Sequence, residues 1–173
     1  MKTTKYLPLA LMLLGAVAFA GAAGAEDLCP RIEISSVEQP EIFDMPKYSA
    51  TKTTDLKVHV VFPDQFKEDH VISLKFRTPA GHLYRQIDVP VTHEVGRQGT
   101  QTVRLPGYPY PVEVAVPEIS RIAGQVAPSI EVRLPVGGTS IATSSLFGQW
   151  QVTGMIDGLE QRCFRPVSFG IVQ

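Results

Sequence analysis

The chain has 173 residues, and its 16 basic and 17 acidic residues give a net charge of −1. No run of like charges occurs in the sequence. It therefore lacks the basic patch that nucleic acid and anionic membrane surfaces select, and neither is an expected partner. The length suits one domain that follows an export signal.

Residues 1–25 have the features of a secretory signal peptide. Two lysines supply the positive start, residues 7–20 form an uncharged apolar run, and Ala23-Gly24-Ala25 fits the small-x-small cleavage rule. Cleavage would leave 173 − 25 = 148 residues beginning at Glu26, located in the periplasm or outside the cell. A retained anchor of about 20 apolar residues is the alternative, but the Gly- and Ala-rich end of the run favours cleavage.

The two cysteines, Cys29 and Cys163, lie near opposite ends of the mature chain. In an exported protein this pair predicts one structural disulfide. Closing a loop of 163 − 29 = 134 positions is worth roughly 4 to 5 kcal/mol by chain entropy, although measured values are more often about 2 to 4. A redox-active or metal-binding pair would need C-x-x-C spacing, which is missing.

Short segments that alternate apolar and polar residues follow one another along the mature chain. Residues 26–55 are expected to contribute a first edge strand at 31–37 and then a polar surface excursion at 38–55. Residues 56–173 are expected to form the core of the same domain, with strands at 56–62, 71–77, 83–91, 102–105, 112–116, 130–136 and 166–172 and a central hairpin before the last strand. Residues 118–125 are predicted to form one or two helical turns.

The central hairpin is predicted around Asp157-Gly158, because both positions of a two-residue type I′ turn need positive φ. An extended approach from Thr139 leads into its first strand, which carries Trp150. The turn would place Ile156 opposite Leu159, Val152 opposite Cys163 and Trp150 opposite Arg165. The resulting apolar face would contain Trp150, Val152, Gly154, Ile156, Leu159 and Cys163. Trp150 is therefore predicted to be a core residue and not a sugar-stacking platform.

Nine or ten short strands without a long helical period predict an all-β fold, an antiparallel β-sandwich. The apolar face of the central hairpin needs a second sheet to cover it. The predicted disulfide would tie the two ends of the mature chain together and close this sandwich.

Two motifs resemble those of immunoglobulin-like or fibronectin-like sandwiches that bacteria export. They are the P-x-G turn within residues 76–84 and the G-x-W-x-V strand at 148–152 with its Asp-Gly turn. The cysteines depart from the antibody pattern, because they lie at the two ends and not on two central strands. The resemblance implies a binding or accessory role for a protein or glycan partner, and it carries no functional residue.

Catalytic and metal-binding signatures are missing from the sequence. The histidines, His59, His70, His82 and His93, occur in no H-x-H or H-E-x-x-H motif, and no G-x-S-x-G elbow is present. We therefore predict no enzyme activity, no catalytic residue, no bound metal and no cofactor. The alternative is a small periplasmic metal carrier or enzyme that uses loop histidines.

Residues 106–111 contain three prolines and two tyrosines, Tyr108 and Tyr110. Proline cannot donate to a β-ladder, so this segment is predicted to be a loop or rim. Tyrosines on a stiff loop lose little entropy on binding, which makes them candidates for partner contact. The alternative is that both rings fold back and cap the open end of the sandwich.

Overall fold

The computed structural model describes residues 30–35, 45–62, 67–96, 99–105, 107–122 and 124–173. The predicted signal peptide, the mature start at Glu26 and Cys29 lie outside these residues. In the described part of the chain the regular structure is strand, apart from one short helix, α1 (Ser140–Thr143). No described helix is long and apolar enough to cross a membrane.

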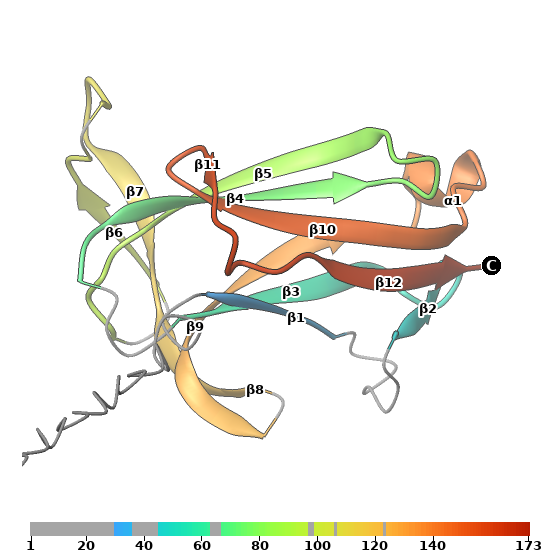
Figure 1. Ribbon diagram of the computed structural model, residues 1–173, viewed down its shortest axis with the longest axis horizontal. Coiled ribbons are helices and arrows are strands. Elements are labelled where there is room, and N and C mark those ends of the chain that lie inside the picture. The colour runs from blue at the N-terminus through green and yellow to red at the C-terminus, as the bar shows by residue number, and fades with distance from the viewer. Residues whose placement is uncertain (1–29, 36–44, 63–66, 97–98, 106, 123) are drawn as a thin grey trace, which may run out of the picture.

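One sheet has four antiparallel strands (Figure 1). In spatial order these are β1 (Arg31–Ser35), β3 (Asp55–Val61), β9 (Gln125–Pro135) and β8 (Glu118–Ile122). The predicted alternation of β3 is confirmed, because Leu56, Val58 and Val60 are fully buried. β1 is an edge strand, as predicted.

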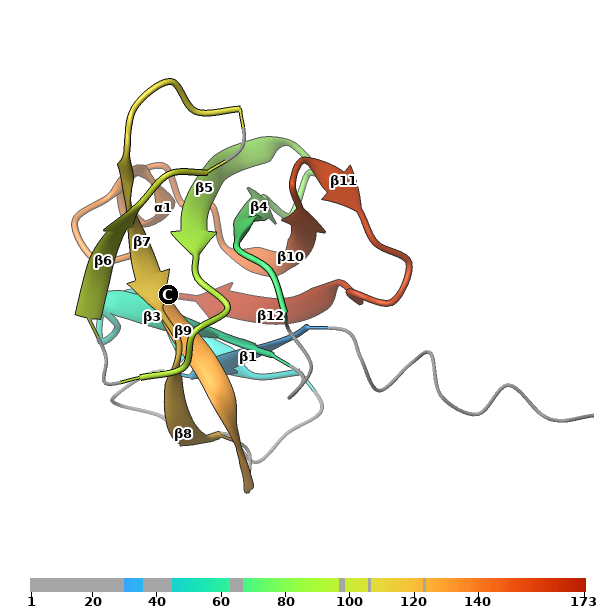
Figure 2. The same ribbon diagram turned by 90° about the vertical axis from the view of Figure 1, so that its left-hand side faces the viewer.

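The second sheet has eight strands. In spatial order it contains β2 (Lys47–Ser49), β12 (Val167–Val172), β10 (Gly148–Ile156), β4 (His70–Arg77), β5 (Leu83–Val91), β7 (Val112–Val116) and β6 (Gly99–Val103), and β11 (Leu159–Glu160) pairs with β10. Figure 2 shows β6 and β7 beyond β5, on the side away from β10. The pairs β2–β12 and β5–β7 are parallel, and the others are antiparallel.

The inner faces of the two sheets form one apolar core, which confirms the predicted β-sandwich. Trp150 on β10 is fully buried within it, as predicted. The edge of Tyr84 meets the indole ring, with centroids 5.2 Å apart, and Phe169 stacks at 6.3 Å. The indole Nε1 donates to the Leu146 carbonyl at 2.8 Å, so this buried polar group is satisfied.

The predicted turn at the central hairpin is confirmed, but most of the predicted pairing is wrong. Asp157 and Gly158 have φ angles of 51° and 77°, as a type I′ turn requires, and Ile156 pairs with Leu159. β11 then ends after two residues, and β10 pairs with β12 instead. Val152 therefore lies opposite Val167, and Trp150 lies opposite Phe169. Leu159 is 66% exposed and does not join the apolar face.

The contact between Phe164 and Gly154 explains why the hairpin opens. Phe164 is buried, and its ring lies over Gly154 so closely that a Cβ at residue 154 would overlap the ring. A strand continuing in register from Glu160 would pair residue 164 with Gln151, whose side chain lies on the exposed face of β10. Leaving the register allows this phenyl ring to cover the glycine and enter the core.

Two further segments form another type of element than predicted. The described residues of 118–125 contain β8 and the start of β9, where Ile122 pairs with Gln125, in place of the predicted helical turn. The extended approach to β10 instead contains α1, whose N-cap Thr139 accepts a hydrogen bond from the Ile141 amide at 3.3 Å. Both segments are too short for periodicity to identify their structure.

The predicted surface excursion at 38–55 is partly a core element, as its described residues 45–55 show. Tyr48 on β2 is only 1% exposed and donates its hydroxyl to the Ile34 carbonyl at 3.0 Å. β2 is held by parallel pairing to β12, a partner more than one hundred residues away in the sequence. Long-range pairing thus buries a segment that looks polar and broken.

Replacing Gly154 by alanine should destabilise the fold, because the added methyl group would overlap the Phe164 ring. We expect a loss of about 1 to 3 kcal/mol in the free energy of unfolding, as for other overpacked cores, measured by urea titration of the Trp150 fluorescence. Thr153→Ala, on the same strand, is the matched control. Adding Phe164→Leu to Gly154→Ala should recover part of the loss, and an unchanged midpoint for Gly154→Ala would contradict this packing.

Candidate functional site

A groove of about 630 Å³ opens at one end of the larger sheet. Its walls are the start of β4, the adjacent part of β5, the segment after β6 and the β10–β11 turn. It is lined by Glu68, Asp69, His70, Val71, Ser73, Gln86, Asp88, Leu105, Tyr108, Asp157 and Gly158. Four of these side chains are carboxylates, and no lysine or arginine is among them. The groove is therefore acidic.

The turn residue Asp157 closes one wall of the groove. Its Oδ2 lies 2.7 Å from His70 Nδ1, and its Oδ1 accepts a hydrogen bond from the Val71 amide at 2.9 Å. The Asp157 amide in turn donates to the Val71 carbonyl at 2.9 Å. Partial burial opposes ionisation of Asp157, but the hydrogen bonds from Val71 and His70 outweigh it and lower its pKa.

Asp69 forms a second carboxylate–imidazole pair, next to the first in the sequence. Its Oδ1 lies 2.7 Å from His93 Nδ1 and also accepts hydrogen bonds from the Thr92 hydroxyl and the His93 amide, each at 3.0 Å. Burial again opposes ionisation, and the hydrogen bonds from His93 and Thr92 outweigh it, so the pKa of Asp69 is lowered. We call Asp157–His70 and Asp69–His93 the two Asp–His pairs.

The two predicted partner-contact tyrosines are both exposed. Tyr108 is 41% exposed and lines the groove, and Tyr110 is 76% exposed. The Tyr108 amide donates to the carbonyl of buried Leu105 at 3.2 Å, which anchors the segment to the groove wall. Their contact with a partner stays a prediction. The acidic groove beside Tyr108 combines side chains from four separate segments, and no sequence motif indicated it.

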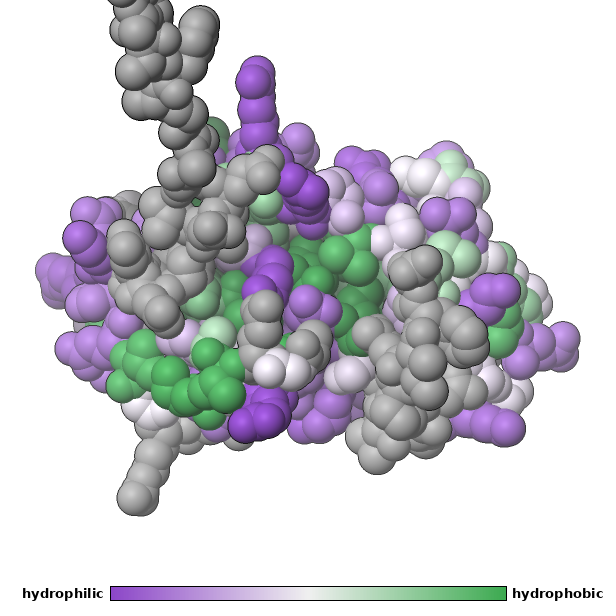
Figure 3. Space-filling model, turned by 60° about the horizontal axis from the view of Figure 1, so that its bottom comes forward, coloured by the Kyte–Doolittle hydropathy of each residue, from purple (hydrophilic) through white to green (hydrophobic). Residues whose placement is uncertain are grey.

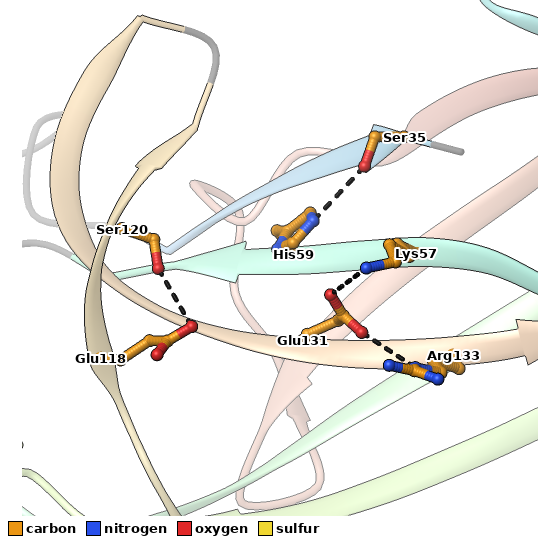
Figure 4. Close-up of polar contacts among 7 residues, drawn as sticks. All are labelled: Ser35, Lys57, His59, Glu118, Ser120, Glu131 and Arg133. Carbon is orange, nitrogen blue, oxygen red and sulfur yellow. Dashed lines mark hydrogen bonds and ion pairs between the residues drawn. The ribbon is translucent and has the colours of Figure 1, made fainter. Parts of the chain in front are cut away.

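His59 lies on β3, on the outer face of the four-stranded sheet (Figure 4), whereas the groove belongs to the larger sheet. The Ser35 Oγ is 3.4 Å from its Nε2, and burial lowers the pKa of the imidazole. Neighbouring Glu131 accepts from Lys57 at 3.0 Å and from Arg133 at 2.9 Å. Among the described residues no carboxylate hydrogen-bonds to His59, so Ser35 and His59 lack the third member of a hydrolase triad.

The remaining histidines are dispersed. His70 and His93 belong to the two Asp–His pairs, and His82 lies in the β4–β5 turn, where its carbonyl accepts from the Thr78 amide at 2.9 Å. Over the described ranges no group of three or more His, Cys, Asp or Glu residues is arranged to hold a metal ion.

Cys163 lies in the segment between β11 and β12, beside buried Phe164. Its predicted partner, Cys29, lies outside the described residues. The Cys29–Cys163 disulfide therefore stays a prediction.

The face turned forward in Figure 3, the lower side of Figure 1, is mainly hydrophilic, with hydrophobic areas between the polar ones. The β8–β9 hairpin contributes two exposed apolar side chains, Ile119 at 57% and Val126 at 59%. Arg121 pairs directly with Val126 across this hairpin. Two exposed apolar side chains do not indicate the chemistry of a partner, so we assign no partner to this hairpin.

No family model matches the chain, and no curated protein matches it. Among solved structures, an immunoglobulin-like protein from Pseudomonas aeruginosa is similar, with 11% sequence identity and a TM-score of 0.41. The similarity covers 83% of this chain and 92% of that protein. At this TM-score the similarity carries no residue role, activity or partner to this chain.

Asp157 should contribute to stability in a pH-dependent way. Because its pKa is lowered in the folded state, its contribution is present above its ordinary pKa of about 3.9 and is lost as the pH falls through the lower folded value. Asp157→Asn keeps a turn-compatible Asn-Gly pair but removes the charge.

We expect this variant to melt several degrees below the wild type at pH 6, with the difference closing as the pH falls below about 4. Thermal melts followed by circular dichroism between pH 2 and pH 6 would measure it. Asp88→Asn is the control, because it changes a groove carboxylate that accepts a hydrogen bond from the Gln86 side chain at 2.8 Å and from no other side chain in the described ranges. A difference that persists unchanged at pH 2.5 would show that the charge of Asp157 has no stabilising role.

Proposed function

We propose that the protein is an exported, non-catalytic β-sandwich module that binds a protein partner at the acidic groove. The observation that carries this proposal is the position of Tyr108, an exposed aromatic residue of a proline-rich segment, in the lining of a concave site. Concave sites with a few placed polar groups and a stiff aromatic rim are typical of binding surfaces.

The charge of the groove favours a protein partner over a glycan. Among the described residues its lining contains four carboxylates and neither lysine nor arginine. Lysine and arginine side chains complement such a surface, and electrostatic complementarity speeds association and selects the partner. A neutral glycan would gain nothing from this charge.

The rival proposal, a small periplasmic metal carrier or enzyme, has less support. It would depend on loop histidines, and His70 and His93 are each paired with one carboxylate. His59 and Ser35 are close, but they lie on an outer sheet face beside the cross-strand ion pair Lys57–Glu131 (Figure 4). Such pairs stabilise a sheet surface without any catalytic role.

Removing both tyrosines should weaken binding and spare the fold. A partner identified by in-cell cross-linking through a photoreactive residue at position 110 would be purified and titrated against Tyr108→Ala/Tyr110→Ala. We expect at least about tenfold weaker binding, as for loss of aromatic interface anchors, and a melting temperature within a few degrees of the wild type, because both rings are exposed.

Leu83→Ala is the matched control, since Leu83 is 53% exposed and does not line the groove. It should leave the affinity unchanged. Two results would count against the proposal: full affinity in the double variant, or a much lower melting temperature, which would mean that the tyrosines cap the core.

Export and the disulfide belong to the same proposal, and intact mass measures both. We expect the protein recovered from the producing cell to begin at Glu26 and to weigh two hydrogens less than its reduced form. Cys163→Ser should abolish that difference. An uncleaved amino terminus would exclude the predicted processing, and two free thiols would exclude the disulfide.

A further inference from the structure

The two Asp–His pairs place two titratable side chains at the groove, bound to two of its four carboxylates. Asp69 and His70 are consecutive residues at the start of β4, so one short segment belongs to both pairs. His70 lines the groove, and His93 contacts the groove residue Asp69. Histidine is the side chain whose ordinary charge change falls between pH 5 and pH 8.

We propose that the two Asp–His pairs make partner binding at the groove pH-dependent, so that a basic partner is held near neutral pH and released as the pH falls toward 5. This inference rests on the proposed function, since it assigns regulation to the same groove.

The hydrogen bonds keep both carboxylates in place while the histidines change charge. An ionised carboxylate only accepts hydrogen bonds, so each imidazole Nδ1, 2.7 Å away, carries the hydrogen. Protonation then adds a proton at Nε2 and leaves the Nδ1 contact intact. Because the pKa values of Asp69 and Asp157 are lowered, both carboxylates stay ionised throughout this pH range.

The sign of the effect follows from the charges around the groove. With neutral imidazoles, the four lining carboxylates Glu68, Asp69, Asp88 and Asp157 give the groove a charge of −4, and protonation of the two imidazoles reduces it to −2. The residues that line the groove from each packed element are acidic or neutral apart from His70: Asp88 on β5, Asp157 on the β10–β11 turn and Tyr108 after β6, with Glu94 beside His93 in the sequence. The basic groups next to them are Lys75, which pairs with Gln86, and Lys67 and Arg104, which adjoin lining residues in the sequence. No described lining residue is lysine or arginine, so the two imidazoles are the groups whose protonation lowers the negative charge of the groove.

The test uses the mature protein and N-acetylated pentalysine amide labelled with tetramethylrhodamine, a probe whose own charge is constant between pH 5.5 and pH 7.5 because lysine titrates near about 10.4. Fluorescence anisotropy at constant ionic strength would give the dissociation constant at both pH values. We expect at least about tenfold weaker binding at pH 5.5, because each added positive charge within several ångströms repels the ligand by about a factor of five to ten. Labelled pentaglutamate is the probe control and should not bind at pH 7.5.

The variant His70→Gln/His93→Gln replaces both imidazoles with side chains that still donate hydrogen bonds but do not ionise. The ratio of its dissociation constants at pH 5.5 and pH 7.5 should fall to near one, whatever its absolute affinity. His82→Gln, in the distant β4–β5 turn, should keep the wild-type ratio. Tryptophan fluorescence would verify folding, and the two single variants replace the double variant if it unfolds.

Thermodynamic linkage between proton binding and pentalysine binding gives a second measurement, which would not change if the histidines had only a structural role. If protonation weakens pentalysine binding, bound pentalysine must shift the midpoints of the His70 and His93 imidazole NMR signals to lower pH. The His82 signal should not move.

The results that would contradict this inference differ from those that would contradict the proposed function. Equal wild-type affinities at the two pH values, or a pH effect that survives in His70→Gln/His93→Gln, would overturn this inference alone. No binding of pentalysine at either pH would overturn the basic-partner assignment of the proposed function, and this inference with it.

Discussion

Burial of Trp150 between Tyr84 and Phe169 is the interaction on which the arrangement of the larger sheet depends. A buried indole needs a hydrogen-bond acceptor, and the Leu146 carbonyl at 2.8 Å supplies it. This bond links the segment after α1 to β10. β10 itself is central, with β12 on one side and β4 on the other. The same tryptophan thus connects β10 to β12 through Phe169, to β5 through Tyr84 and to the segment after α1 through Leu146.

The groove is a consequence of how β10 ends. The type I′ turn brings Asp157 close to Val71. The Val71 amide donates to the Asp157 carboxylate and the Asp157 amide donates to the Val71 carbonyl, and these two hydrogen bonds are each 2.9 Å long. The start of β4 is thereby fixed beside the turn, while Asp69 ties the same segment to His93. Loop residues positioned by a rigid sheet are a common setting for binding sites. The scaffold therefore fixes the carboxylates, and the tyrosines lie on a connection beside them.

The outer face of the four-stranded sheet shows the contrasting use of charge. Glu131 on β9 pairs with Lys57 on the adjacent strand β3 at 3.0 Å and with Arg133 on its own strand at 2.9 Å (Figure 4). In the groove, Asp69 and Asp157 accept hydrogen bonds from imidazoles and backbone amides, and the lining residues that the structure describes include no lysine or arginine. On the outer face of the four-stranded sheet, the charged side chains are thus paired with one another. The groove keeps a negative electrostatic potential that a partner can bind, and this is the physical difference between the two polar surfaces.

The sequence alone determined the strand alternation of β3 and β4, the core position of Trp150 and the turn at Asp157-Gly158, because period-two patterns and positive-φ turn residues act over a few neighbouring residues. Only the tertiary structure decided that β10 pairs with β12, that Tyr48 is buried and that 118–122 is a strand, since each needs a partner distant in sequence or in a neighbouring strand. The sequence did not predict the groove either. Its lining comes from four separate segments, and their meeting depends on sheet order, which no local pattern encodes.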